Sequence, residues 1–130
     1  MASHTIRNLK ELDDSAVQFG MSPSMEARFA REELGTEQSG LSYQRLAPGF
    51  RQPFGHRHKQ QEEVYVVLSG SGRIKLDNEI VELREWDTVR IPPATTRQLE
   101  AGPDGLGYLA FGAPNVGSGD AEVVEGWWSD

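Results

Sequence analysis

The chain contains no cysteine among its 130 residues. Disulfide bonds and thiolate metal sites are therefore excluded, and any bound metal must use imidazole, carboxylate or water ligands. No apolar run approaches the roughly 20 residues that a membrane-spanning helix needs. The N-terminal segment MASHTIRNLKELDD also lacks the apolar stretch of a signal peptide. We therefore expect a cytoplasmic protein with no membrane partner.

Positive charge is scarce as well. Thirteen lysines and arginines face 20 aspartates and glutamates, which leaves a net charge of −7. Because nucleic-acid binding needs a positive surface, a nucleic-acid partner is not expected. A chain of this length suits one domain with a single core, and we predict one domain over residues 1–130.

The chain is rich in turn-forming residues, with 14 glycines and seven prolines. Alternating or β-branched segments lie between the turns and indicate short strands, at residues 39–47, 64–68, 73–76, 80–83, 87–91, 96–100 and 106–111. The first clear stop is the glycine-rich segment 69–72, and a further turn is expected at 102–105. Asp77-Asn78-Glu79 predicts a hairpin, and Pro92-Pro93 ends a strand. Residues 25–35 fit helix and strand equally well. This spacing predicts an antiparallel sandwich or barrel.

The segment VYVVL, residues 64–68, is apolar at every position, so both of its faces should be covered. The barrel interior covers one face. The other needs a second sheet, a second subunit in a homodimer, or the chain's own N-terminal segment. Trp127 and Trp128 lie in an otherwise polar tail, which indicates docking onto the barrel or a partner, with a disordered tail as the alternative.

Two histidines precede VYVVL. His56 and His58 are two residues apart, so in an extended segment both imidazoles point the same way. Glu62 and Glu63 follow, and spacing alone does not choose between them. Two imidazoles and one carboxylate form a facial triad that suits iron, manganese, nickel or zinc. The competing interpretation is a solvated polar loop.

At these residues the sequence resembles the cupins, whose first motif is G-x5-H-x-H-x3-4-E-x6-G. His56, His58, Glu63 and Gly70 fit it, and the closing glycine selects Glu63 over Glu62; Gly49 lies one residue too early. The second motif, G-x5-P-x-G-x2-H-x3-N, retains Pro92. The other positions differ, with Trp86, Ala94, Arg97 and Ala101 in place of glycine, glycine, histidine and asparagine.

The resemblance implies an all-β fold, an antiparallel double-stranded β-helix (jelly roll) of six to eight strands with the site inside the barrel. It covers residues 41–111, leaving an N-terminal arm with the first strands at 1–38 and a C-terminal tail at 112–130. It implies that His56, His58 and Glu63 are metal ligands. The family includes oxygenases, isomerases, decarboxylases and binding modules, so the fold does not name the reaction.

Arg97 stands where the family's fourth ligand, a histidine, is expected. It shares a strand face with Leu99, so an inward Leu99 implies an inward, charged Arg97 that needs a partner. The partner is Glu63, or an anionic group on a ligand, unless the guanidinium reaches water at the barrel mouth. We therefore expect a divalent-metal site that binds a small anionic molecule, with Arg97 as a ligand-binding residue. The alternative is a metal-free binding or sensor module in which Arg97 replaces the metal charge.

Overall fold

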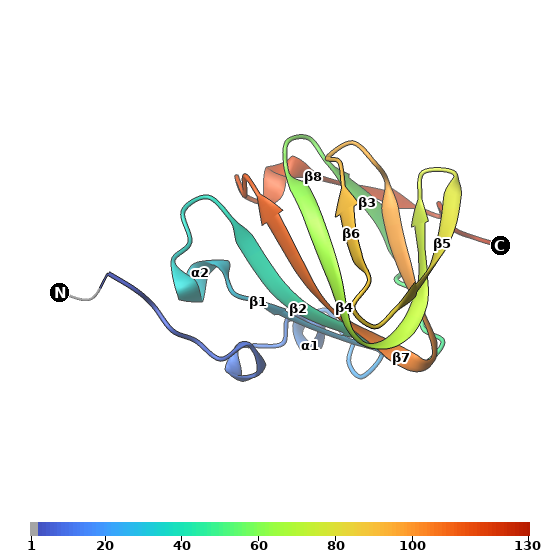
Figure 1. The fold of residues 1–130 in the computed structure, drawn as a ribbon, viewed down its shortest axis with the longest axis horizontal. Helices are drawn as coiled ribbons and strands as arrows, with labels where there is room; N and C mark the ends of the chain where they lie inside the picture. The colour runs from blue at the N-terminus through green and yellow to red at the C-terminus, as the bar shows by residue number, and fades with distance from the viewer. Residues whose placement is uncertain (1–2) are drawn as a thin grey trace.

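A computed structural model describes residues 3–130, and over this range the chain folds into one curled sheet of eight strands (Figure 1). The strands are β1 (Met25–Phe29), β2 (Gly40–Leu46), β3 (Phe54–His58), β4 (Glu62–Leu76), β5 (Glu79–Arg84), β6 (Thr88–Ile91), β7 (Arg97–Ala113) and β8 (Ala121–Glu125). Four short helical segments accompany them: η1 (Leu9–Glu11), α1 (Ser15–Gln18), α2 (Arg31–Leu34) and η2 (Ser118–Asp120). The predicted all-β double-stranded β-helix is confirmed.

Two long antiparallel strands, β4 and β7, organise the barrel. They pair with each other along most of their length, from Glu62↔Ala113 to Leu76↔Arg97. β7 also pairs with β2 and, at Arg97↔His56, with β3. β4 pairs in addition with β6 and β5. Because each long strand serves different partners along its length, the sheet curls round on itself and encloses an interior.

Two predicted turns are wrong as strand ends. The glycine-rich segment 69–72 lies inside β4, and segment 102–105 lies inside β7. The register of the pair shifts here: Gly70 pairs with Leu106, whereas Gly72 pairs with Ala101. Gly70, with φ +73°, would bring an added Cβ to 2.0 Å from the carbonyl oxygen of Gly105. The glycines therefore permit a sharp bend with close backbone approach rather than ending the strands.

The other strand boundaries follow the sequence closely. β4 and β5 form the predicted hairpin, and Asp77 occupies its turn at φ +50°. β6 ends at Ile91, directly before the two prolines. The ambiguous segment 25–35 contains both structures, because β1 is followed at once by the single-turn helix α2, which Gly35 ends at φ +71°.

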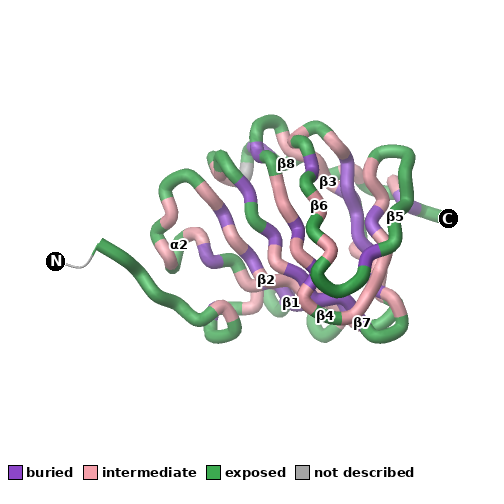
Figure 2. The backbone as a smooth tube through the Cα atoms, viewed as in Figure 1, coloured by how far each residue is buried: buried purple, intermediate pink, exposed green. Residues whose placement is uncertain are grey.

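The core lies between the two sides of the curled sheet. Its fully buried members include Leu46, Val67, Ile74, Ile91, Leu99 and Leu106. Figure 2 shows that buried residues follow the strands, whereas the N-terminal segment and the loops are exposed. In VYVVL, Tyr65 and Val67 are buried and the other three are half-buried. A homodimer that covers this second face stays a prediction.

The C-terminal segment docks on the barrel and adds a strand that the glycine-rich sequence did not predict. β8 pairs with β3 from Phe54↔Glu125 to His58↔Ala121. Beyond it, Trp128 is buried with its ring 4.2 Å from the guanidinium carbon of Arg51, and the Trp127 ring lies under the ammonium of Lys75 at 4.4 Å. Docking onto the chain's own barrel is confirmed, and a disordered tail is excluded. No helix among residues 3–130 has the length and apolar character to cross a bilayer.

Candidate metal centre

Three neighbouring strands bring the predicted site residues together. His56 and His58 lie on β3, Glu63 lies near the start of β4, and Arg97 is the first residue of β7. Alternation along β3 points both imidazoles inward, with ring centroids 5.1 Å apart. Glu62, on the opposite face of β4, is exposed and pairs with Arg90. Glu63 is therefore the carboxylate of the cluster, as the closing glycine indicated.

The two imidazoles converge on one oxygen atom. Nε2 of His58 lies 3.3 Å from Oε1 of Glu63, and Nε2 of His56 lies 3.5 Å from the same oxygen. One ligand atom from each residue lies within 4.8 Å of the other two. Ligands about 2.1 Å from a common metal ion are about 3.0–3.5 Å apart in tetrahedral or octahedral sites. The spacing thus fits a first-row divalent ion.

The orientation of His58 is set by a residue that the sequence did not reveal. Nδ1 of His58 lies 3.1 Å from Oδ2 of Asp120, the last residue of η2. Asp120 also accepts hydrogen bonds from the backbone N–H groups of Gln60 and Gln61. Because a carboxylate only accepts, Nδ1 is the donor towards Asp120, and this contact turns Nε2 towards Oε1 of Glu63. That Nε2 is buried and has no hydrogen-bond partner among the described residues.

Both carboxylates of the site are held in the ionised form. Burial alone would raise the pKa of Glu63, but His56, His58 and the charge of Arg97 outweigh it and keep the pKa well below the usual range. Burial likewise opposes ionisation of Asp120, and the N–H groups of Gln61 and Gln60 together with His58 lower its pKa overall. Tyr65 donates a hydrogen bond to Oε1 of Glu63 at 3.1 Å. An ionised carboxylate therefore lies on either side of His58.

Arg97 is completely buried, so the expectation of a guanidinium solvated at the barrel mouth is wrong. Its Nη2 donates to the carbonyl oxygen of Pro92 at 3.1 Å, and its Nη1 lies 3.7 Å from Oε1 of Glu63. That separation is an ion pair without a hydrogen bond, and Nε and Nη1 have no hydrogen-bond partner among the described residues. Arg97 contributes charge to the cluster, and direct ligand binding by it stays a prediction.

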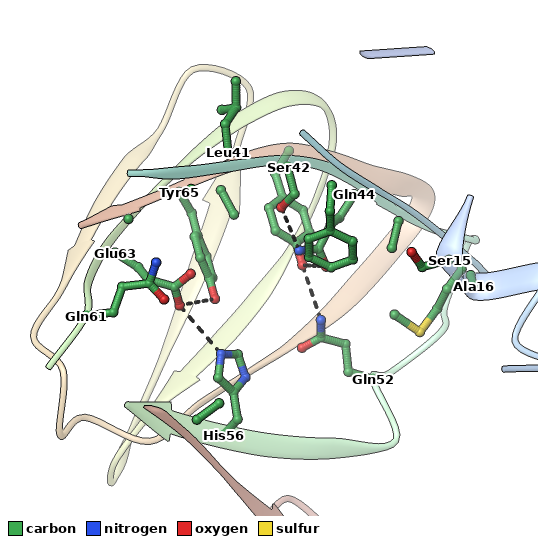
Figure 3. A pocket seen from close by; sticks show the side chains of 18 of the residues that line it. Ser15, Ala16, Leu41, Ser42, Gln44, Gln52, His56, Gln61, Glu63 and Tyr65 are labelled. Atoms are coloured by element: carbon green, nitrogen blue, oxygen red, sulfur yellow. Dashed lines mark hydrogen bonds and ion pairs between the residues drawn. The ribbon is translucent and has the colours of Figure 1, made fainter. Parts of the chain in front are cut away.

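The cluster forms one end of a cavity of about 650 Å³ (Figure 3). His56, His58, Glu63 and Tyr65 line this end, whereas Arg97 is not part of the lining. Gln61 is buried and also lines the cavity. Its side chain occupies the space beside Gly112, where an added Cβ would meet Gln61 Nε2 at 2.5 Å. Gln61 lies three positions before Val64, and nothing in the local sequence indicates that it is buried.

Comparison with known proteins identifies the family. Residues 42–104 match the model of a family described as the cupin domain. A cupin protein from Bacteroides fragilis superposes with a TM-score of 0.73 at 28% sequence identity, covering 91% of this chain and 90% of that one. The chain carries a cupin domain. The site described above therefore lies inside a cupin barrel, with both histidines and Glu63 within the matched residues.

Further relatives of the cupin domain extend the comparison. An uncharacterised protein of Methanocaldococcus jannaschii is 38% identical over 71 residues, which are 54% of this chain and 57% of that protein. The match thus spans little more than half of the archaeal protein. The oxalate decarboxylase of Bacillus subtilis superposes with a TM-score of 0.78 at 18% identity, over 94% of this chain and 32% of that one. This last likeness concerns the cupin fold.

Proposed function

We propose that the cupin barrel binds a divalent metal ion through His56, His58 and Glu63, and that the ion in turn binds a small-molecule ligand in the cavity. The observation that carries the proposal is the buried, unpartnered Nε2 of His58, 3.3 Å from Glu63 Oε1. A buried ring nitrogen without a hydrogen-bond partner is costly, and a cation held between it and the carboxylate removes that cost.

Each residue has a separate part in this proposal. Asp120 fixes the tautomer and the ring orientation of His58 from behind, as carboxylates commonly do for metal-binding histidines. Tyr65 orients Glu63 through its hydroxyl. Three protein ligands leave coordination positions free on the cavity side. A divalent ion here would supply Lewis-acid polarisation of an oxygen atom on the ligand.

Arg97 favours one alternative, a metal-free binding or sensor module. Its guanidinium already places a positive charge 3.7 Å from Glu63 Oε1. In that case the arginine serves as the permanent counter-charge, and the two imidazoles bind the ligand by hydrogen bonds. The two proposals differ in whether purified protein takes up metal at neutral pH.

The test is a titration of chelator-treated protein with Zn²⁺, Mn²⁺, Fe²⁺ and Ni²⁺ by calorimetry, with elemental analysis of untreated protein. We expect one ion per chain, and no uptake by the His56→Ala/His58→Ala double variant. Asp120→Asn should weaken the affinity by about 10- to 100-fold while leaving the stoichiometry at one. Asp104→Asn, an exposed aspartate in the β7 bend, is the matched control and should change nothing. Absence of uptake by well-folded wild-type protein would refute the metal proposal and favour the alternative.

A further inference from the structure

The cavity has two chemically different ends. At one end lie His56 and Glu63, and at the other lies the N-terminal segment, represented by Ser15 and Ala16 of α1 (Figure 3). Its volume of about 650 Å³ falls in the usual range of about 300–1,000 Å³ for pockets that enclose whole drug-sized molecules. A ligand of only a few atoms bound at the cluster would fill only a small part of this volume.

The wall away from the cluster is largely apolar. Besides the two histidines, the charged side chains of the lining are Glu63 and Arg31. Much of the rest consists of large apolar side chains from four parts of the chain, namely Phe19, Met21, Met25, Phe29, Phe54 and Val123. Such a lining gains free energy by covering hydrocarbon, and Arg31, whose Nε is buried without a hydrogen-bond partner among the described residues, is its basic side chain away from the cluster.

The polar side chains along the middle of the cavity are already partnered. Gln52 Nε2 donates to the hydroxyl of Tyr108 at 3.2 Å, and that hydroxyl donates to Gln44 Oε1 at 2.9 Å. Gln44 Nε2 donates in turn to Oγ of Ser42 at 3.0 Å. Because these groups form a continuous chain with one another, this middle part of the wall does not depend on polar groups of a ligand to be satisfied.

Several apolar lining residues are also strongly exposed. Phe19 is 77% exposed, Phe29 and Val123 are each 55% exposed, and Phe54 is 38% exposed. They come from the loop after α1, from β1, from β8 and from β3. Exposed apolar side chains that line one cavity together are typical of a binding surface, whereas scattered single ones are not. These four side chains line the cavity that also contains the candidate metal centre.

We infer that the ligand is an amphipathic anion, with an oxygen-bearing head group at His56, His58 and Glu63 and an extended hydrocarbon body that runs towards Met21 and Phe19. The inference rests on the proposed function for the head group and on the apolar wall for the body. It narrows the expected small anion to one with a long apolar body. Met21, Phe19 and Phe29 are then the residues that determine ligand length.

The experiment measures how affinity depends on chain length. Straight-chain carboxylates from acetate to decanoate are titrated into Zn²⁺-loaded protein by calorimetry. We expect the affinity to rise about threefold per methylene over the middle of the series, because each buried methylene adds a roughly constant transfer free energy. A flat series, with zinc bound normally, overturns the inference and leaves the proposed function intact.

Variants of the apolar lining test whether it causes the rise in affinity with chain length. Met21→Glu should weaken octanoate binding at least tenfold while leaving the affinities for acetate and for Zn²⁺ unchanged. Phe19→Ser is the second variant, because a side chain that is 77% exposed is not needed for folding, and it should weaken octanoate binding several-fold. Ile80→Glu, on the β4–β5 hairpin and outside the lining, is the matched control and should change none of the three. Equal octanoate affinity in wild type and both cavity variants contradicts the inference.

A series of neutral 1-alkanols, titrated into chelator-treated protein, separates the two proposals. If the protein takes up no zinc, the proposed function and the head-group assignment both fail. A rise of alkanol affinity with chain length, lost in Met21→Glu, would then still support the apolar part of the ligand. No rise in either series overturns that part as well.

Discussion

The two segments that correspond to the cupin motifs match them in different respects, the first in its side chains and the second in its backbone. In the first, His56, His58, Glu63 and Gly70 fit the motif, and the structure brings the first three to a common oxygen atom. In the second, the backbone course is retained while the side chains differ. Arg97 takes the place of histidine yet still lies against the cluster, 3.7 Å from Glu63.

Trp86 makes the same point for the backbone. It stands where the motif has glycine, and it adopts φ +72°, in the left-handed region that glycine favours. The carbonyl of Arg84 accepts a hydrogen bond from the N–H of Asp87, which places Trp86 at the third position of a tight turn. The fold therefore imposes the turn geometry at both motifs, while the chemistry of the second has changed. Substitutions at Glu63, Arg97 and Trp86 test this contrast.

The largest effect is expected at Glu63, the residue of the first motif that forms an ion pair with Arg97 of the second. In metal-free protein Glu63→Ala removes the acidic partner of a fully buried guanidinium, and we expect a loss of about 3 kcal/mol or more in unfolding free energy. The adjacent Glu62→Ala is the matched control, since its pair with Arg90 is exposed, and it should cost less than about 0.5 kcal/mol. Urea denaturation at pH 7 measures both.

Acid should reduce this difference in stability. The pKa of Glu63 is lowered in the folded protein from its ordinary value of 4.5, so its ionised form stabilises the fold fully above that pH. The contribution is lost as the pH falls from 4.5 towards the lowered pKa. Wild type and Glu63→Gln should therefore converge in stability in this range. Parallel stability profiles would contradict an ionised, interacting Glu63.

A second, intermediate effect is expected when Arg97 is changed to the residue that the family motif has. Arg97→His removes a positive charge beside the cluster and adds an imidazole, so the affinity for Zn²⁺ should rise at least tenfold in chelator competition. Arg90→His, on the exposed face of β6, provides the control and should leave the affinity unchanged. An unaltered affinity in folded Arg97→His would mean that position 97 no longer reaches the metal centre.

The smallest effect concerns Trp86. Its side chain is 72% exposed, so little packing is lost when it is replaced. Trp86→Gly relieves the strain of a positive φ and should stabilise the protein by about 0.5–1 kcal/mol in thermal or urea unfolding. Trp86→Ala keeps the Cβ and should bring no such gain, which separates backbone strain from loss of the indole.

The sequence predicted the barrel and the cluster because both depend on local patterns. Strand-forming segments bounded by turn residues located β2 and β6. Asp77 marked the hairpin, and two histidines before an apolar strand marked the site. It failed where conformation depends on distant partners. Gly70 and Gly105 look like turn residues, yet they lie inside β4 and β7 because the two strands bend together at that point.

Asp120 shows the same limit at the site. It lies 62 residues after His58 in a glycine-rich segment, and nothing local marks it as different from other acidic residues of the tail. Phe54 and Phe111 are large and apolar, yet both are exposed, because alternation gives the face of a strand and not what covers that face. Such pairings follow from the closed sheet and not from spacing.

The docking of β8 against β3 has a practical consequence for anyone dissecting the protein. The family match stops at residue 104, but the carboxylate behind His58 and the strand that flanks both histidines come later in the chain. A fragment trimmed to the matched borders would keep all three candidate metal ligands and lose what holds two of them in place. A fragment intended for metal-binding studies should therefore include the last twenty residues, which lie outside the family match.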